Sequence, residues 1–262
     1  MRSRPFPDPR ALHGFALLEL AIALLVLAVL LGGLALPLAA QVQMRRQDEA
    51  RRQLDEAKDA LMGFAAAHGR LPCPATSDSR GTESFAPGGD ASNGNCAAFH
   101  DGYLPAATLG LSPLDTEGFA RDPWQGERNR IRYAVFGAGS EVNGVANPLT
   151  RTDGMQAATL SGLGAASHYL FICSTAEQAS GSGCGPAANQ LTRRAAFALL
   201  SLGLDAASIP APGSDEACNL DGDGVFVSRE ASDAPGNGFD DIVTWVPIHL
   251  VIHRLVVAGR LP

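Results

Sequence analysis

The feature that most constrains this chain is a long uncharged stretch near its N-terminus. No Asp, Glu, Lys or Arg occurs from Leu20 to Met44, and most residues there are Leu, Ala, Val or Ile. As a helix, residues 20–40 would be about 30 Å long, which is roughly the thickness of the hydrocarbon core of a bilayer. Three arginines lie within residues 2–10, and the positive-inside rule keeps such a leader in the cytoplasm. The sequence therefore predicts one membrane span, with the rest of the chain outside the cytoplasm.

Other classes of protein fit the sequence less well. A cleaved secretory signal has an apolar core of about 7–15 residues, which is shorter than this stretch. A polytopic membrane protein would need a second uncharged run of about 18 residues, and the chain has none. The formal net charge of −7 argues against a general nucleic-acid binder, which needs a basic surface for phosphates.

One carboxylate lies at the start of the apolar run. A charged group at the centre of a membrane helix costs about 2.5–3.5 kcal/mol, so Glu19 requires a partner. The segment Gly14-Phe15-Ala-Leu-Leu-Glu19-Leu, between a short basic leader and an apolar helix, resembles the N-terminal cleavage and methylation motif of type IV prepilins. That family includes the pilins of type IV pili and the pseudopilins of type II secretion systems.

The resemblance implies a processing route and a set of partners. Prepilin peptidase would cut after Gly14 and N-methylate the new first residue, Phe15. In the assembled filament, Glu19 would pair with the N-terminal amine of a neighbouring subunit, because each buried charge is costly alone. The protein would be a single-pass inner-membrane protein with its head in the periplasm, and later part of a pilus or pseudopilus. His13 departs from the motif, since Lys or Arg is common at that position.

The resemblance and the hydrophobic pattern together predict an α+β pilin-like fold. We expect a leader at 1–14, a transmembrane or filament-core helix at 15–40, its amphipathic continuation at 41–68, and a periplasmic globular head at 69–262. The long helix would pack on a loop-rich antiparallel β-sheet. Strands are expected at 131–136, 168–173, 225–228 and 241–246, a short helix or buried strand at 195–204, and preferably a strand at 248–258.

Five cysteines lie beyond the apolar run and none forms a Cys-x-x-Cys pair, so disulfides are the favoured interpretation. Pairing of neighbours predicts Cys73 with Cys96 and Cys173 with Cys184, leaving Cys218 free. A bridge from Cys184 to Cys218 is the main alternative.

The acidic residues are concentrated near the C-terminus. Between Asp205 and Asp241 there are nine acidic side chains and one basic side chain, Arg229. Within this region, Asn219, Asp221, Asp223 and Glu230 have the spacing of a calcium loop, with Gly224 at the sixth position. Asp240 and Asp241 could join them as ligands. The alternative is a solvated turn rich in Asx residues.

No nucleophile, metal-protease or phosphate-loop motif occurs, so the chain is not expected to be an enzyme. The sequence predicts a minor pilin or pseudopilin, and it does not distinguish a type IV pilus from a type II secretion system. The alternative is a calcium-dependent adhesive subunit at a filament tip. A signal-anchored periplasmic enzyme is less favoured, because it would need a catalytic cluster.

Overall fold

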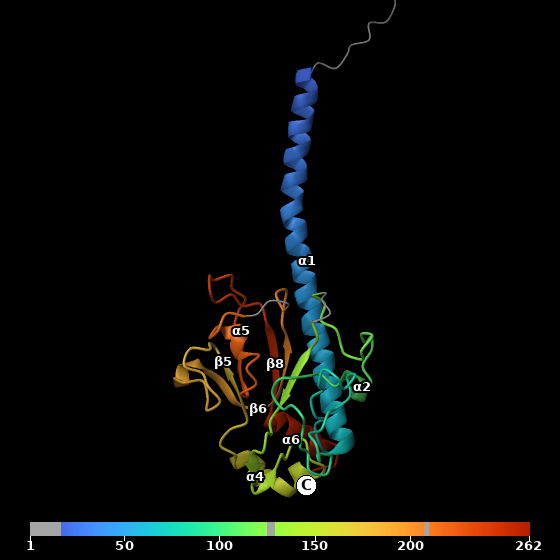
Figure 1. Cartoon of the computed structure of the whole chain (residues 1–262), viewed down its shortest axis with the longest axis vertical. Coiled ribbons are helices and arrows are strands. Elements are labelled where there is room, and N and C mark those ends of the chain that lie inside the picture. Colours follow the sequence, from blue (N-terminus) through green and yellow to red (C-terminus); the bar gives the residue numbers. More distant parts are fainter. Residues whose placement is uncertain (1–16, 125–128, 207–209) are drawn as a thin grey trace, which may run out of the picture. The chain divides into compact units, whose positions relative to one another are not determined.

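The computed structural model describes residues 17–124, 129–206 and 210–262, and it describes side chains in these ranges except at 30–40. Gly14 and Phe15, the predicted processing site, lie outside the described residues. The chain divides into two compact units, residues 1–46 and residues 47–262, which are treated separately below. Helix α1 (Leu17–His68) contributes residues to both units (Figure 1).

The described part of the first unit is helical, and its side chains at 17–29 are all exposed. Two predictions are wrong here. No helix in the described part of the chain is both long and apolar enough to cross a membrane. The membrane-spanning half of the helix and the single-pass inner-membrane location are therefore not supported.

Within the second unit, α1 is amphipathic. Ala50, Leu54, Ala57, Leu61 and Ala65 recur at intervals of three or four residues, and each is at most 1% exposed. This spacing places them on one face of the helix, which packs into the main hydrophobic core. The buried face explains why this segment is helical despite its several charged residues.

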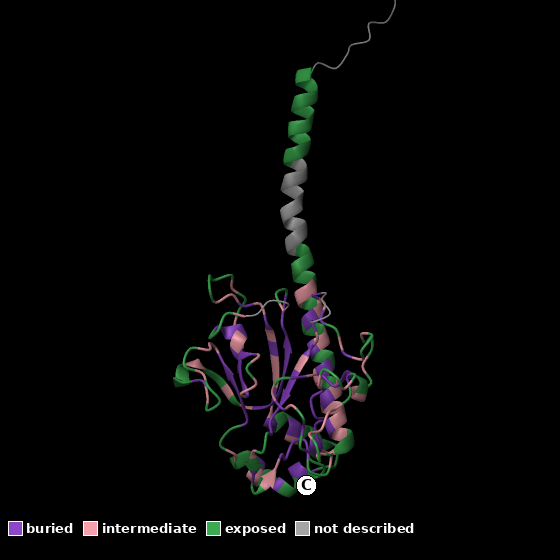
Figure 2. Ribbon diagram, in the orientation of Figure 1, coloured by how far each residue is buried: buried purple, intermediate pink, exposed green. Residues whose placement is uncertain are grey.

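The second unit contains a six-stranded sheet. The longest strand, β6, is the hub: it pairs with β2, β5 and β8. Residues 195–201 of β6 are buried without a break, as expected of a strand covered on both faces, and Figure 2 shows buried residues along the sheet. The strands are β1 (Gly102–Tyr103), β2 (Arg132–Val135), β5 (Leu170–Cys173), β6 (Gln190–Ser201), β7 (Val225–Val227) and β8 (Ile242–Pro247).

The prediction of an antiparallel sheet is wrong, because β5 and β7 pair in parallel. The sheet is mixed, and the fold of the described residues is α+β. The connection from β5 to β7 passes through the whole of β6, which pairs antiparallel with β5, so β5 lies between β6 and β7. A separate two-stranded ribbon is formed by β3 (Glu141–Val142) and β4 (Val145–Ala146).

The strand favoured at 248–258 is also wrong, because α6 (Ile248–Val257) occupies this segment. Ile248, Val251 and Leu255 are buried, and their spacing of three and four residues is helical. The segment is so apolar that its sequence fits the two-residue period of a strand as well as the 3.6-residue period of a helix. Packing against the core favours the helix. The remaining helices are short: α2 (Ala106–Leu109), α3 (Gly154–Ala158), α4 (Leu160–Ala165), the 3-10 helix η1 (Ala187–Asn189) and α5 (Asp215–Cys218).

Both disulfides predicted from neighbouring cysteines are confirmed. Cys73 bonds to Cys96, and Cys173 bonds to Cys184, while Cys218 is a buried free thiol. The first disulfide fastens the irregular segment that follows α1. An ion pair between Arg70 and Glu83 also stabilises this segment. It is nearly buried, and its nitrogen–oxygen distance is 2.8 Å.

Candidate functional site

The predicted calcium loop does not form one cluster of ligands in the structure. Asn219 is buried, and its side chain is used in structural hydrogen bonds. Its amide oxygen accepts a hydrogen bond from the Val227 backbone N–H at 2.7 Å, and its amide nitrogen donates one to the Asp241 carboxylate at 2.7 Å. Glu230 is exposed, and its carboxylate has no hydrogen-bond partner among the described residues. Asn219 thus ties β7 to the start of β8.

Asp221 and Asp223 form a turn of the kind described by the alternative interpretation. Asp221 accepts from the backbone N–H of Asp223 at 3.1 Å, and Asp223 accepts from that of Val225 at 2.9 Å. Burial raises the pKa of Asp221 to about 6, and the nearby charge of Asp223 raises it further. These two carboxylates are close enough to repel one another.

A different set of carboxylates converges at one end of the sheet. Oxygens of Asp205, Glu216 and Asp240 all lie within 4.8 Å of one another. Asp205 follows β6, Glu216 lies in α5, and Asp240 precedes β8. Three segments distant in sequence therefore supply this acidic cluster, which we define as Asp205, Glu216 and Asp240.

Backbone contacts hold the acidic cluster in place. Asp240 accepts from the Leu204 N–H at 2.7 Å, and its own N–H donates to Glu216 at 3.1 Å. The second oxygen of Asp240 is buried and has no hydrogen-bond donor. Gly203 adopts φ of +64°, and a Cβ there would come within 1.9 Å of that oxygen, so only glycine allows this approach.

The electrostatics of the acidic cluster are unfavourable without a cation. Burial raises the pKa of Asp240 and of Glu216, and the charge of Asp205 raises both further. Burial also raises the pKa of the adjacent Asp241 to about 8, with the cluster's charges adding to the effect against the hydrogen bond from Asn219. No ion pair involves these four carboxyl groups in the described part of the chain.

Carboxylate oxygens are the ligands that Ca²⁺ prefers, so Asp205, Glu216 and Asp240 could hold such an ion. Of the predicted ligands, only Asp240 belongs to this set. Sequence spacing could not find Asp205 and Glu216, although both lie in the acidic region that the sequence shows.

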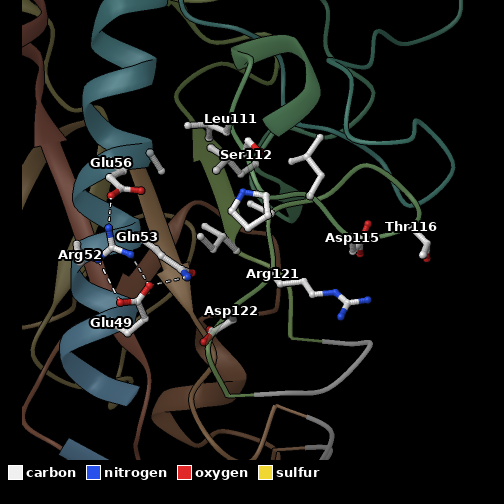
Figure 3. A pocket seen from close by; sticks show the side chains of 16 residues that line it. Glu49, Arg52, Gln53, Glu56, Leu111, Ser112, Asp115, Thr116, Arg121 and Asp122 are labelled. Carbon is white, nitrogen blue, oxygen red and sulfur yellow. Dashed lines mark hydrogen bonds and ion pairs between the residues drawn. The ribbon is translucent and has the colours of Figure 1, made fainter. Parts of the chain in front are cut away.

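A second feature is a cavity of about 800 Å³ between α1 and the segment 111–122 (Figure 3). Its walls are partly apolar, with Leu104, Leu111 and Ile131, and partly polar, with Gln53 and Asp122. Its size lies in the range of ligand pockets.

At residues 17–29 of the first unit, large apolar side chains are exposed around the whole circumference of α1. Leu17 is 88% exposed and Leu18 is 72% exposed. Glu19 is exposed among them and is the one charged residue within 17–29. Further large apolar residues exposed on this segment are Leu20, Ile22, Leu24, Leu25, Val26, Leu27 and Val29.

Comparison of the chain with protein-family models, with curated proteins and with solved structures found no match.

Proposed function

We propose that this chain is a structural subunit of a type IV pilus or type II secretion filament, and that it assembles through its N-terminal helix. The observation that carries the proposal is the exposed apolar surface of α1 at 17–29. A helix that is apolar all around needs apolar neighbours on every side, and the same helix in other copies of the chain supplies them.

The position of Glu19 supports this assembly. It is the one carboxylate within the apolar segment 17–29, so packing of copies along this segment would bury it. A buried carboxylate is costly unless a cation pairs with it. Cleavage after Gly14 by a prepilin peptidase would create such a cation, the amine of Phe15, at a matching position in a neighbouring copy.

The test is to shear filaments from cells that express the chain, collect them by ultracentrifugation, and determine the N-terminus of the protein by mass spectrometry. We expect the chain in the filament fraction, beginning at N-methylated Phe15. A mature N-terminus near Gln41, or a chain found only outside the filament fraction, would contradict the proposal.

A second candidate is a calcium-dependent adhesive subunit of such a filament, and the acidic cluster favours it. Calcium would hold together three segments whose charges otherwise repel. Binding of the purified protein to host cells or polymers, measured in calcium and in chelator, separates this candidate from a purely structural subunit, which should show no calcium-dependent adhesion.

A further inference from the structure

The cavity beside α1 has walls that are partly apolar and partly polar, and one of its lining residues carries a hydrogen-bond acceptor without a donor. The oxygen of the Gln53 side chain is buried and has no hydrogen-bond partner. The orientation of this amide is fixed, because its nitrogen donates to the Glu49 carboxylate at 3.2 Å. The amide oxygen is thus left to accept a bond from something else. A buried acceptor without a donor destabilises the protein, because it has lost its hydrogen bonds to water.

The other polar group is the carboxyl of Asp122, which is only 4% exposed. It accepts hydrogen bonds from the Ser201 hydroxyl and from the backbone N–H of Trp124, both neutral groups. No cation pairs with it among the described residues, and the charge of Asp240 adds to its cost of ionisation. Burial raises the pKa of Asp122 to about 6, so it is mainly charged at pH 8.

The remaining charges around the cavity are already matched. Arg52 bonds to Glu49 and to Glu56, each at 2.6 Å. Arg130, from outside the lining, pairs with Asp115 at 2.9 Å. These pairs leave Asp122 as the carboxylate of the lining without a cationic partner in the described structure.

Arg121 does not fill that role. Consecutive residues of an extended segment point in opposite directions, and Figure 3 shows the Arg121 guanidinium extending away from α1 while Gln53 projects toward the cavity. The cavity thus combines a negative charge without a cation among the described residues, an unused acceptor and a partly aliphatic wall.

We propose that this cavity is a binding site for an organic cation, an ammonium group carried on an aliphatic body. The ammonium N–H groups would donate to the oxygen of Gln53 and compensate the charge of Asp122. The aliphatic body would lie against Leu104, Leu111 and Ile131, where it leaves water. This proposal does not depend on the filament role.

The test uses the full-length protein at pH 8 and three probes, whose affinities are measured by saturation-transfer NMR titration. The probes are hexylamine, hexan-1-ol and hexyltrimethylammonium. Hexylamine should bind at least tenfold more tightly than the alcohol, which lacks the charge. The trimethylated probe keeps the charge but has no N–H to donate, so it should bind about fivefold more weakly than hexylamine.

Two variants separate the contributions of the polar groups. Asp122→Asn should weaken hexylamine at least tenfold and leave hexan-1-ol within twofold. Gln53→Met should weaken hexylamine about threefold or more. Asp233→Asn removes one exposed carboxylate that does not line the cavity, and it should leave all affinities unchanged.

Circular dichroism would verify that each variant is folded. If Asp122→Asn does not fold, the ratio of hexylamine to hexan-1-ol affinity in the wild-type protein decides the outcome. Equal affinities of the amine and the alcohol, no saturable binding of either, or an unchanged amine affinity in a folded Asp122→Asn protein would overturn the proposal.

Discussion

Replacing Asp240 by Asn should have two opposite effects on thermal stability, depending on calcium. Two full charges 4.8 Å apart, the limit of the separations in the acidic cluster, repel by about 3.5 kcal/mol at an effective dielectric constant of 20. Asp205 is exposed to solvent, which screens its charge, so the relief is smaller, about 1–2 kcal/mol. In chelator, Asp240→Asn should therefore melt about 2–8 °C higher than the wild-type protein.

Calcium should act in the other direction. An ion that binds only the folded state stabilises it by about 2.7 kcal/mol at a hundredfold excess over its Kd, which corresponds to a rise in Tm of about 5–11 °C. The wild-type protein should show this rise, and Asp240→Asn should lose most of it. Magnesium should substitute poorly, because it gives up its water reluctantly.

Differential scanning calorimetry in millimolar calcium and in chelator measures both effects. Asp223→Asn is the matched control, since it removes one carboxylate of the predicted loop that lies outside the acidic cluster. If calcium no longer raises the Tm of Asp223→Asn but still raises that of Asp240→Asn, the calcium site is in the 219–230 loop and not in the acidic cluster. Coincident wild-type melting curves with and without calcium would refute calcium binding altogether.

Three further perturbations have clear expected outcomes. Glu19→Ala should leave folding of the second unit unchanged but reduce incorporation into filaments in competition with wild type; equal incorporation, counted by quantitative mass spectrometry, would refute the pairing with a neighbour's amine. The double change Cys73→Ser and Cys96→Ser frees a loop with a sequence separation of 23 residues and should cost about 3 kcal/mol in urea unfolding, whereas a cost below 1 kcal/mol would show that the segment is held by other contacts. Burial raises the pKa of Asp122 from 3.8 to about 6, so the folded state binds its proton more tightly and stability should fall as pH rises from about 4 to 6. Asp122→Asn should lack this fall, which reaches at most about 1.4 kcal/mol per pH unit; identical pH profiles of the two proteins in urea unfolding would contradict it.

The elements predicted best are those whose pattern has one structural solution. The strands predicted near 131–136, 168–173 and 241–246 are short apolar runs bounded by turn residues, and each overlaps a strand in the structure. The disulfides were predictable because neighbouring cysteines in a loop-rich chain close short loops. The prediction for 248–258 was wrong because this apolar segment fits the period of a strand as well as that of a helix. Packing of its side chains, Val251 among them, into the hydrophobic core decides in favour of the helix.

The parallel pairing of β5 and β7 could not be read from the sequence for a different reason. Strand direction in a sheet depends on which strands become neighbours, and β7 is separated from β5 by more than fifty residues. Its three residues carry no signal of their own for a parallel partner. The mixed sheet is thus a property of the whole unit, as is the position of the acidic cluster.

That position follows once the pairing of β6 with β8 is known. The two strands run antiparallel, and their register sets Ser201 opposite Ile242. The residues that follow β6 must then lie beside those that precede β8, which places Asp205 next to Asp240. Helix α5 adds Glu216 to the same end, through the hydrogen bond from the Asp240 backbone. The prediction of a calcium loop from sequence spacing requires ligands that are close in sequence. Here the register of the sheet brings the carboxylates together instead. A cation bound among them would consequently stabilise the pairing of two central strands as well as the loops, so calcium dependence should appear in the melting of the whole second unit.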